Sequence, residues 1–100
     1  MTVLKTPGDV NIVVSTDSDV RLYRAPVGQF GIDIFAHKAQ SGTIYYYTHS
    51  WSVIHPAGYS LLTPKEARDR LTHLAGLPGE GRLDEDEKKT AKRYFPRIFP

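Results

Sequence analysis

The chain has 100 residues, of which 40% are hydrophobic and 24% are charged, and it contains no cysteine. These values are typical of one globular domain that can bury a core without disulfide staples. The absence of thiols excludes disulfides and thiolate metal sites and favours a reducing compartment, so we expect a cytoplasmic protein. No apolar run in the sequence is long enough to span a bilayer, and the first residues show no pattern of a secretory leader.

The formal net charge of +2 is weak support for an anionic partner. Residues 1–50 carry four basic and four acidic side chains, whereas residues 51–100 carry nine and seven. The basic excess therefore lies in the second half of the chain.

Alternating apolar residues predict four strands in the first half of the chain. Residues 9–15 and 19–24 flank a cluster of turn-forming residues and are expected to pair as a hairpin. Residues 30–38 give the cleanest alternation, and the fourth strand lies in residues 43–56, TIYYYTHSWSVIHP. Because the connections are short, we expect an antiparallel meander within residues 1–56.

The stretch LLTPKEARDRLTHLAG predicts a helix over residues 63–75. Thr63 is the expected N-cap, and Glu66 completes a capping box with it. Ala67, Leu71 and Leu74 recur at helical spacing and form one apolar stripe, which we expect to pack on the sheet.

A second, marginal helix is predicted over residues 84–95. Asp84 can cap it, and its early acids and later bases suit the helix dipole. Its apolar face is thin, and residues 96–100 form a tail because Pro96 stops the helix. The predicted fold is thus α+β: a four-stranded antiparallel meander packed by one well-capped helix, with a second marginal C-terminal helix, in a single domain over residues 1–100.

The turn at residues 39–42 decides which residues of the fourth strand face the core, because a slip of one residue exchanges the two faces. A four-residue loop pairs Lys38 with Thr43 and turns Tyr45, Tyr47 and Trp51 inward. A loop of residues 40–42 with a glycine bulge turns Tyr46 and Thr48 inward instead. We favour the first register, because burying two tyrosines, the tryptophan and Val53 removes more apolar surface from water.

The favoured register leaves an aromatic sheet face that is open unless the second helix and tail cover it. Exposed apolar patches on small domains mark interaction sites. We therefore predict a non-enzymatic module that binds another protein, in an accessory or inhibitory role, or that forms a homodimer. The predicted partner-binding residues are Arg21, Tyr23, Phe35, His37 and Tyr46.

The alternative is a nucleic-acid-binding domain. In this case Tyr23, Phe35 and Tyr46 would stack on bases, and a basic C-terminal helix would contact phosphates. The residues predicted for these phosphate contacts are Lys88, Lys89, Lys92, Arg93 and Arg97.

The sequence predicts neither a metal site nor a catalytic site. The four histidines, at positions 37, 49, 55 and 73, show no metal-ligand spacing. Asp33 and His37 share a predicted strand face, where a polar surface pair is the better interpretation than an acid–base pair. No phosphate-binding loop or nucleophile elbow is present in the sequence, so we expect no cofactor and no enzymatic activity.

Overall fold

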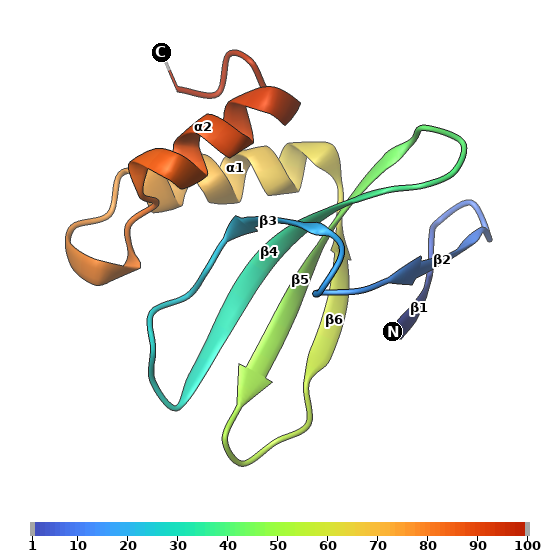
Figure 1. Cartoon of the computed structure of the whole chain (residues 1–100), viewed down its shortest axis with the longest axis horizontal. Helices are drawn as coiled ribbons and strands as arrows, with labels where there is room; N and C mark the ends of the chain where they lie inside the picture. The colour runs from blue at the N-terminus through green and yellow to red at the C-terminus, as the bar shows by residue number, and fades with distance from the viewer. Residues whose placement is uncertain (1, 100) are drawn as a thin grey trace.

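The computed structural model describes residues 2–99, so Met1 and Pro100 lie outside the described part of the chain. Within residues 2–99 the elements follow one another as six strands and two α-helices, with a short 3-10 helix before the last (Figure 1). Their bounds are β1 (Thr2–Lys5), β2 (Asn11–Val14), β3 (Val20–Tyr23), β4 (Phe30–Lys38), β5 (Ile44–Ser52), β6 (Gly58–Leu62), α1 (Pro64–Ala75), the 3-10 helix (Gly79–Gly81) and α2 (Glu85–Tyr94). No helix within residues 2–99 has the length and apolar character needed to cross a membrane.

The main sheet is a four-stranded antiparallel meander in the order β3-β4-β5-β6. The predicted α+β fold is therefore confirmed, but the membership of the sheet differs from the prediction. β2 pairs with β1 in a separate hairpin and not with β3. The fourth strand of the meander is β6, which the sequence analysis interpreted as a break before the helix.

The β1–β2 hairpin closes through a tight turn at residues 6–9. The Thr6 amide donates to the Val10 carbonyl at 2.9 Å, and the Asp9 amide donates to the Thr6 carbonyl at 3.0 Å. Asp9 takes a left-handed conformation with φ 62°, which aspartate tolerates better than most residues. This local turn explains why β2 pairs backward with β1 and leaves β3 to the main sheet.

The register between β4 and β5 contradicts the one that we favoured from the sequence. Lys38 pairs with Ile44, Ala36 with Tyr46 and Ile34 with Thr48. Gly42 has φ 91°, and its amide donates to the Ala39 carbonyl, which gives the shorter loop with a glycine bulge. Tyr46 and Tyr47 consequently face opposite sides of the sheet.

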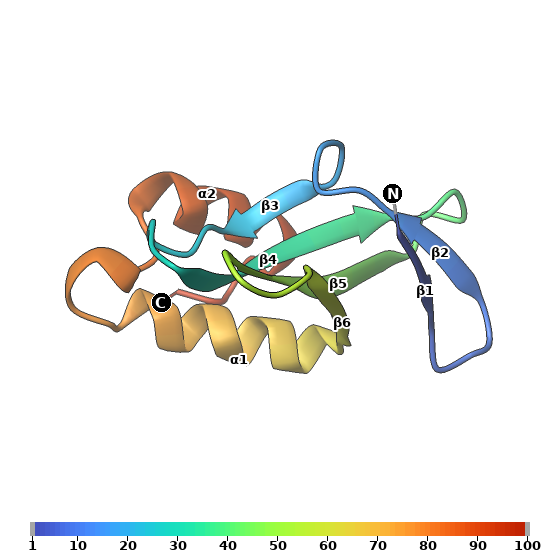
Figure 2. The same cartoon turned by 90° about the horizontal axis from the view of Figure 1, so that it is seen from below.

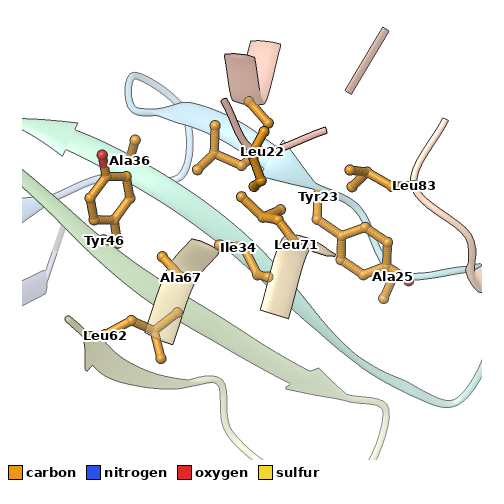
Figure 3. Packing of buried hydrophobic residues seen from close by; sticks show 12 residues of the cluster. Leu22, Tyr23, Ala25, Ile34, Ala36, Tyr46, Leu62, Ala67, Leu71 and Leu83 are labelled. Atoms are coloured by element: carbon orange, nitrogen blue, oxygen red, sulfur yellow. The ribbon is translucent and has the colours of Figure 1, made fainter. Parts of the chain in front are cut away.

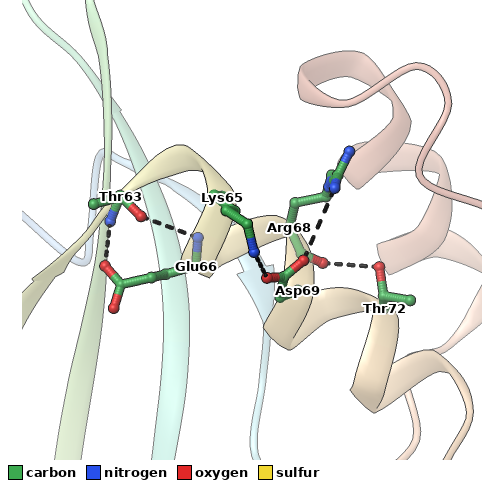
Figure 4. A network of polar contacts seen from close by, with 6 residues as sticks. All are labelled: Thr63, Lys65, Glu66, Arg68, Asp69 and Thr72. Atoms are coloured by element: carbon green, nitrogen blue, oxygen red, sulfur yellow. Dashed lines mark hydrogen bonds and ion pairs between the residues drawn. The ribbon is translucent and has the colours of Figure 1, made fainter.

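Helix α1 begins as the sequence predicts. The Glu66 amide donates to the Thr63 hydroxyl at 3.1 Å, and the Thr63 amide donates to the Glu66 carboxylate at 2.9 Å (Figure 4). These two bonds form the capping box and lower the pKa of the Glu66 carboxyl. The buried residues of α1 are Ala67 and Leu71, both members of the predicted stripe.

The larger core lies between the sheet and the two helices (Figure 3). Tyr46, Ile34 and Leu62 from the sheet pack with Ala67 and Leu71 from α1. Helix α2 and the tail close one side of this core. The rings of Tyr94 and Phe95 lie 6.2 Å and 5.1 Å from the ring of Tyr46. The interpretation in which the second helix and the tail cover Tyr46 is therefore correct.

A smaller core lies on the other face of the sheet, beneath the β1–β2 hairpin. Ile12 and Val14 of β2 pack on Phe35 and Tyr47, and all four side chains are buried. The Phe35 and Tyr47 rings stack with their centroids 5.3 Å apart. In Figure 2 the two helices lie at the left and the hairpin at the right. Both faces of the central strands are thus covered over part of their length.

Replacing Tyr46 with alanine tests this arrangement of the sheet. Tyr46 is 5% exposed and packs against other aromatic rings. Tyr46→Ala should therefore lower the free energy of unfolding by about 3–5 kcal/mol. Urea denaturation followed by circular dichroism measures the change. The neighbouring Tyr45 is half-buried, so Tyr45→Ala is the matched control and should cost clearly less. A larger loss for Tyr45→Ala than for Tyr46→Ala would contradict the observed register.

Candidate functional site

The structure does not bring the five predicted partner-binding residues together. Tyr23 and Tyr46 are buried beneath the helices, whereas Phe35 is buried on the opposite face under the hairpin. Arg21 is exposed and His37 is half-buried. The prediction that the three aromatic side chains form an exposed surface is therefore wrong. The cause is the register of β5, together with an irregularity in β3.

The irregularity in β3 lies between Arg21 and Tyr23. Arg21 pairs with Phe35, but Tyr23 pairs with Ile34, so the alternation of faces shifts by one residue. Leu22 and Tyr23 both enter the larger core as a result. The Tyr23 hydroxyl reaches the end of this core and donates to the Gly81 carbonyl at 2.8 Å.

His37 belongs to a polar network that the sequence analysis missed. Its Nδ1 atom lies 2.8 Å from Oδ1 of Asp19, and the Tyr47 hydroxyl donates to Oδ2 of Asp19 at 2.7 Å. The Ser15 amide also donates to Oδ2, at 2.9 Å. Since an ionised carboxylate only accepts hydrogen bonds, Nδ1 of His37 is the donor in this contact. The carboxylate is nearly buried and has three donors around it.

This network holds the connection between the hairpin and the main sheet. Asp19 lies at the end of the 15–19 turn, while His37 and Tyr47 come from β4 and β5. We had considered Asp33 as the partner of His37. Asp33 instead accepts a hydrogen bond from the Ala25 amide at 2.8 Å. A local sequence pattern cannot identify Asp19, because the contact joins residues 18 and 28 positions apart.

Burial raises the pKa of the Tyr47 phenol well above its usual value, and the hydrogen bond and charge of Asp19 raise it further. Burial is also the main cause that raises the pKa of Tyr23 and of Tyr46. These phenols therefore stay neutral over the physiological range. We call the contacts of Asp19 with Ser15, His37 and Tyr47 the Asp19 latch, because they tie the 15–19 turn to β4 and β5. Residues 2–99 contain no cluster of three His, Cys, Asp or Glu side chains that could hold a metal ion.

Of the nine large apolar side chains that are exposed within residues 2–99, five lie elsewhere, in the first half of β4 and in the loops next to the start of β4 and the end of β5. The Val53 amide donates to the Gln29 carbonyl at 3.0 Å, which holds the two loops at this end side by side. Both loops lie at the lower end of the sheet in Figure 1. We call the following residues the apolar end: Val27 (90% exposed), Phe30 (78%), Ile32 (47%), Val53 (71%) and Ile54 (77%).

A groove of about 580 Å³ adjoins the apolar end and runs between β4 and α1. Phe30 and Ile32 form one side of it and Leu74 the other. Asp69 and Arg70 of α1 stand among its lining residues. The groove is thus apolar at its floor and carries charges of both signs on the helix.

A second groove, of about 400 Å³, lies on the hairpin side of the sheet and is lined by Arg21, Arg24, Asp33 and Trp51 among others. The Trp51 indole lies across Gly31 of the neighbouring strand. A Cβ atom on residue 31 would come within 2.5 Å of the indole and 2.7 Å of the Ala25 side chain. Glycine is therefore required there, and the tryptophan covers the gap that it leaves in β4.

The basic residues of the nucleic-acid alternative lie on the helix side of the molecule. Lys88 is largely covered and lies 3.4 Å from Glu85. Lys89, Lys92, Arg93 and Arg97 are exposed on α2 and the tail. Phe35, one of the three aromatic side chains predicted to accompany them, lies on the other face of the sheet, and all three are buried.

Comparisons of the chain with protein-family models, with curated proteins and with solved structures give no match. The candidate site is therefore defined by the geometry of this chain alone.

The buried phenols predict a loss of stability at alkaline pH. The unfolded chain ionises its tyrosines near pH 10, whereas the folded chain keeps Tyr47 protonated to higher pH. The stabilisation is thus complete below about pH 10 and is lost as the pH rises above that value. The free energy of unfolding should fall there by up to about 1.4 kcal/mol per pH unit for each such tyrosine.

Urea denaturation between about pH 8 and 11.5 checks this expectation. Tyr47→Phe removes the phenol, so its free energy of unfolding should fall less steeply with pH than that of the wild type. Tyr45→Phe is the control, because the Tyr45 ring is only half-buried. Equal slopes for the wild type and Tyr47→Phe would contradict the prediction.

Proposed function

We propose that this chain is a small, non-enzymatic module that binds another protein through the apolar end. The observation that carries the proposal is the exposure of five large apolar side chains beside an apolar groove. Single exposed apolar residues are common on protein surfaces, whereas several at one end of a sheet beside an apolar groove are typical of an interaction site.

The apolar end is well suited to present a fixed surface. Its residues project from the ends of the two central strands and from loops joined by the Gln29–Val53 hydrogen bond. A preformed surface loses little conformational entropy on binding, so more of the gain from burying apolar groups remains as affinity. Phe30 is the expected anchor, since aromatic side chains at the centre of an interface contribute most to binding.

The proposal includes no catalytic step. The Asp19–His37 pair is the one arrangement in residues 2–99 that resembles an acid–base pair. Its carboxylate is already occupied by the Tyr47 hydroxyl and the Ser15 amide. An accessory or inhibitory role agrees with a domain that acts only by binding. We also propose a cytoplasmic location, because the chain has no cysteine.

Protein binding is better supported than nucleic-acid binding. Stacking on bases requires exposed rings next to basic side chains, but Tyr23, Phe35 and Tyr46 are buried. The bases of α2 also follow directly on the acids Glu85, Asp86 and Glu87, which repel phosphates. Binding to single-stranded DNA or RNA that weakens steeply with salt would favour the alternative.

Replacing the anchor tests the proposal. The partner is first identified by affinity capture from the native host, and binding is then measured with both purified proteins by calorimetry. Phe30→Glu places a charge at the centre of the contact and should weaken binding at least about tenfold. Because Phe30 is 78% exposed, the free energy of unfolding should change by less than about 0.5 kcal/mol.

Val3→Glu is the matched control. Val3 is 61% exposed on the β1–β2 hairpin, away from the apolar end, so its replacement should leave affinity unchanged. The proposal fails if Phe30→Glu binds the partner as tightly as the wild type does.

A further inference from the structure

We propose that the partner of the apolar end is a second copy of this chain, bound across a two-fold axis with the two α1 helices antiparallel. This inference rests on the proposed function and names the partner. Two features of the surface support it: a projecting side chain beside a groove, and a charge pattern on α1 that complements itself.

The first feature is the position of Phe30 next to the groove. Phe30 forms part of the groove wall, yet most of its side chain is exposed. In a two-fold contact each surface meets its own copy, so a projection and a groove that lie side by side can fill one another twice. The groove volume of about 580 Å³ falls within the range of roughly 300–1,000 Å³ that holds several apolar groups.

The second feature is the flank of α1 that borders the groove. At 100° per residue, Glu66, Asp69, Arg70 and His73 fall within about one third of the helix circumference. Asp69, Arg70 and His73 line the groove. Along this flank the acidic residues Glu66 and Asp69 come first and the basic residues Arg70 and His73 follow. Within the chain, Asp69 also pairs with Lys65 at 2.8 Å, and Glu66 accepts the capping bond from the Thr63 amide (Figure 4).

An antiparallel two-fold contact places the acidic half of one flank opposite the basic half of the other. If Asp69 faces Arg70 of the second copy, then Arg70 faces its Asp69, and Glu66 faces its His73. Each of these pairs joins residues of opposite charge, or of opposite charge once the histidine is protonated. A parallel arrangement would instead place like charges opposite one another. The charge pattern therefore favours a second copy in one particular orientation.

The size of the contact sets the expected strength of the dimer. The five residues of the apolar end and the four of the α1 flank are fewer than the roughly 20–30 residues that each partner supplies to a standard interface. Interfaces at this small end of the range belong to weak complexes. We expect the dimer to dissociate with a constant on the order of 10 µM, so that its formation depends on protein concentration.

Sedimentation equilibrium of the purified chain from about 1 to 200 µM tests the dimer directly. The wild type should change from monomer to dimer over this range. Phe30→Glu should weaken the dimer at least about tenfold, and circular dichroism should show that the variant is folded. Val13→Glu is the control, because Val13 is exposed on the outer face of the hairpin and should leave the dimer unchanged.

A charge exchange tests the antiparallel contact. In Asp69→Arg, the new arginine at position 69 faces Arg70 of the second copy, so two positive charges are opposed. In Arg70→Asp, the new aspartate at position 70 faces Asp69 of the second copy, so two negative charges are opposed. Each variant alone should therefore dimerise at least about tenfold more weakly than the wild type. In an equimolar mixture the two variants can pair with each other, which restores opposite charges at both positions. The mixture should therefore dimerise with about the affinity of the wild type. A mixture that dimerises no better than either variant alone would overturn the proposed arrangement.

The outcomes separate this inference from the proposed function. The second-copy proposal is overturned if the wild-type chain stays monomeric at 200 µM. It is also overturned if the Phe30→Glu variant dimerises as well as the wild type does. The proposed function then still stands if the captured partner binds Phe30→Glu more weakly than the wild type. It fails as well if no captured partner binds Phe30→Glu more weakly.

Discussion

The positive φ of Gly42 sets the arrangement of the whole domain. At φ 91° this residue shortens the turn between β4 and β5 and pairs Lys38 with Ile44. Every residue of the two longest strands then takes its face from this pairing, because side chains alternate along a strand. Tyr46 faces the helices and Tyr47 faces the hairpin. A side chain at residue 42 would disfavour the same conformation, and with it the division of the aromatic residues between two cores.

Each of the two cores buries one tyrosine of β5, and the two tyrosines are accommodated by different contacts. Tyr46 packs among the rings of Tyr94 and Phe95, which belong to α2 and the chain that follows it. Tyr47 is fully buried, and its hydroxyl depends on Asp19 as an acceptor. A buried hydroxyl without a partner would cost several kcal/mol, so the Asp19 latch is a condition for burying Tyr47. The same latch fixes the 15–19 turn and hence the position of the hairpin.

Local signals in the sequence predicted the helices well, because a capping box and an apolar stripe act within a few residues. The favoured register is wrong because a comparison of apolar area cannot decide between two faces that are both covered. In the structure both faces are covered, so burying Tyr47 does not require exposing Tyr46. The candidate site was missed for a related reason. Phe30 and Ile32 alternate like core residues, but they lie beyond the part of the sheet that the helices bury.

The limit of helical cover explains where the apolar end arises. β4 and β5 each have nine residues, and the end formed by Phe30, Ile32 and Val53 extends past the region that the helices bury. On the other face, the hairpin covers Phe35 and Tyr47 but stops short of this end as well. The far end of these long strands is left without a covering layer within residues 2–99. An apolar surface produced in this way is most stable when another chain completes the layer that is missing.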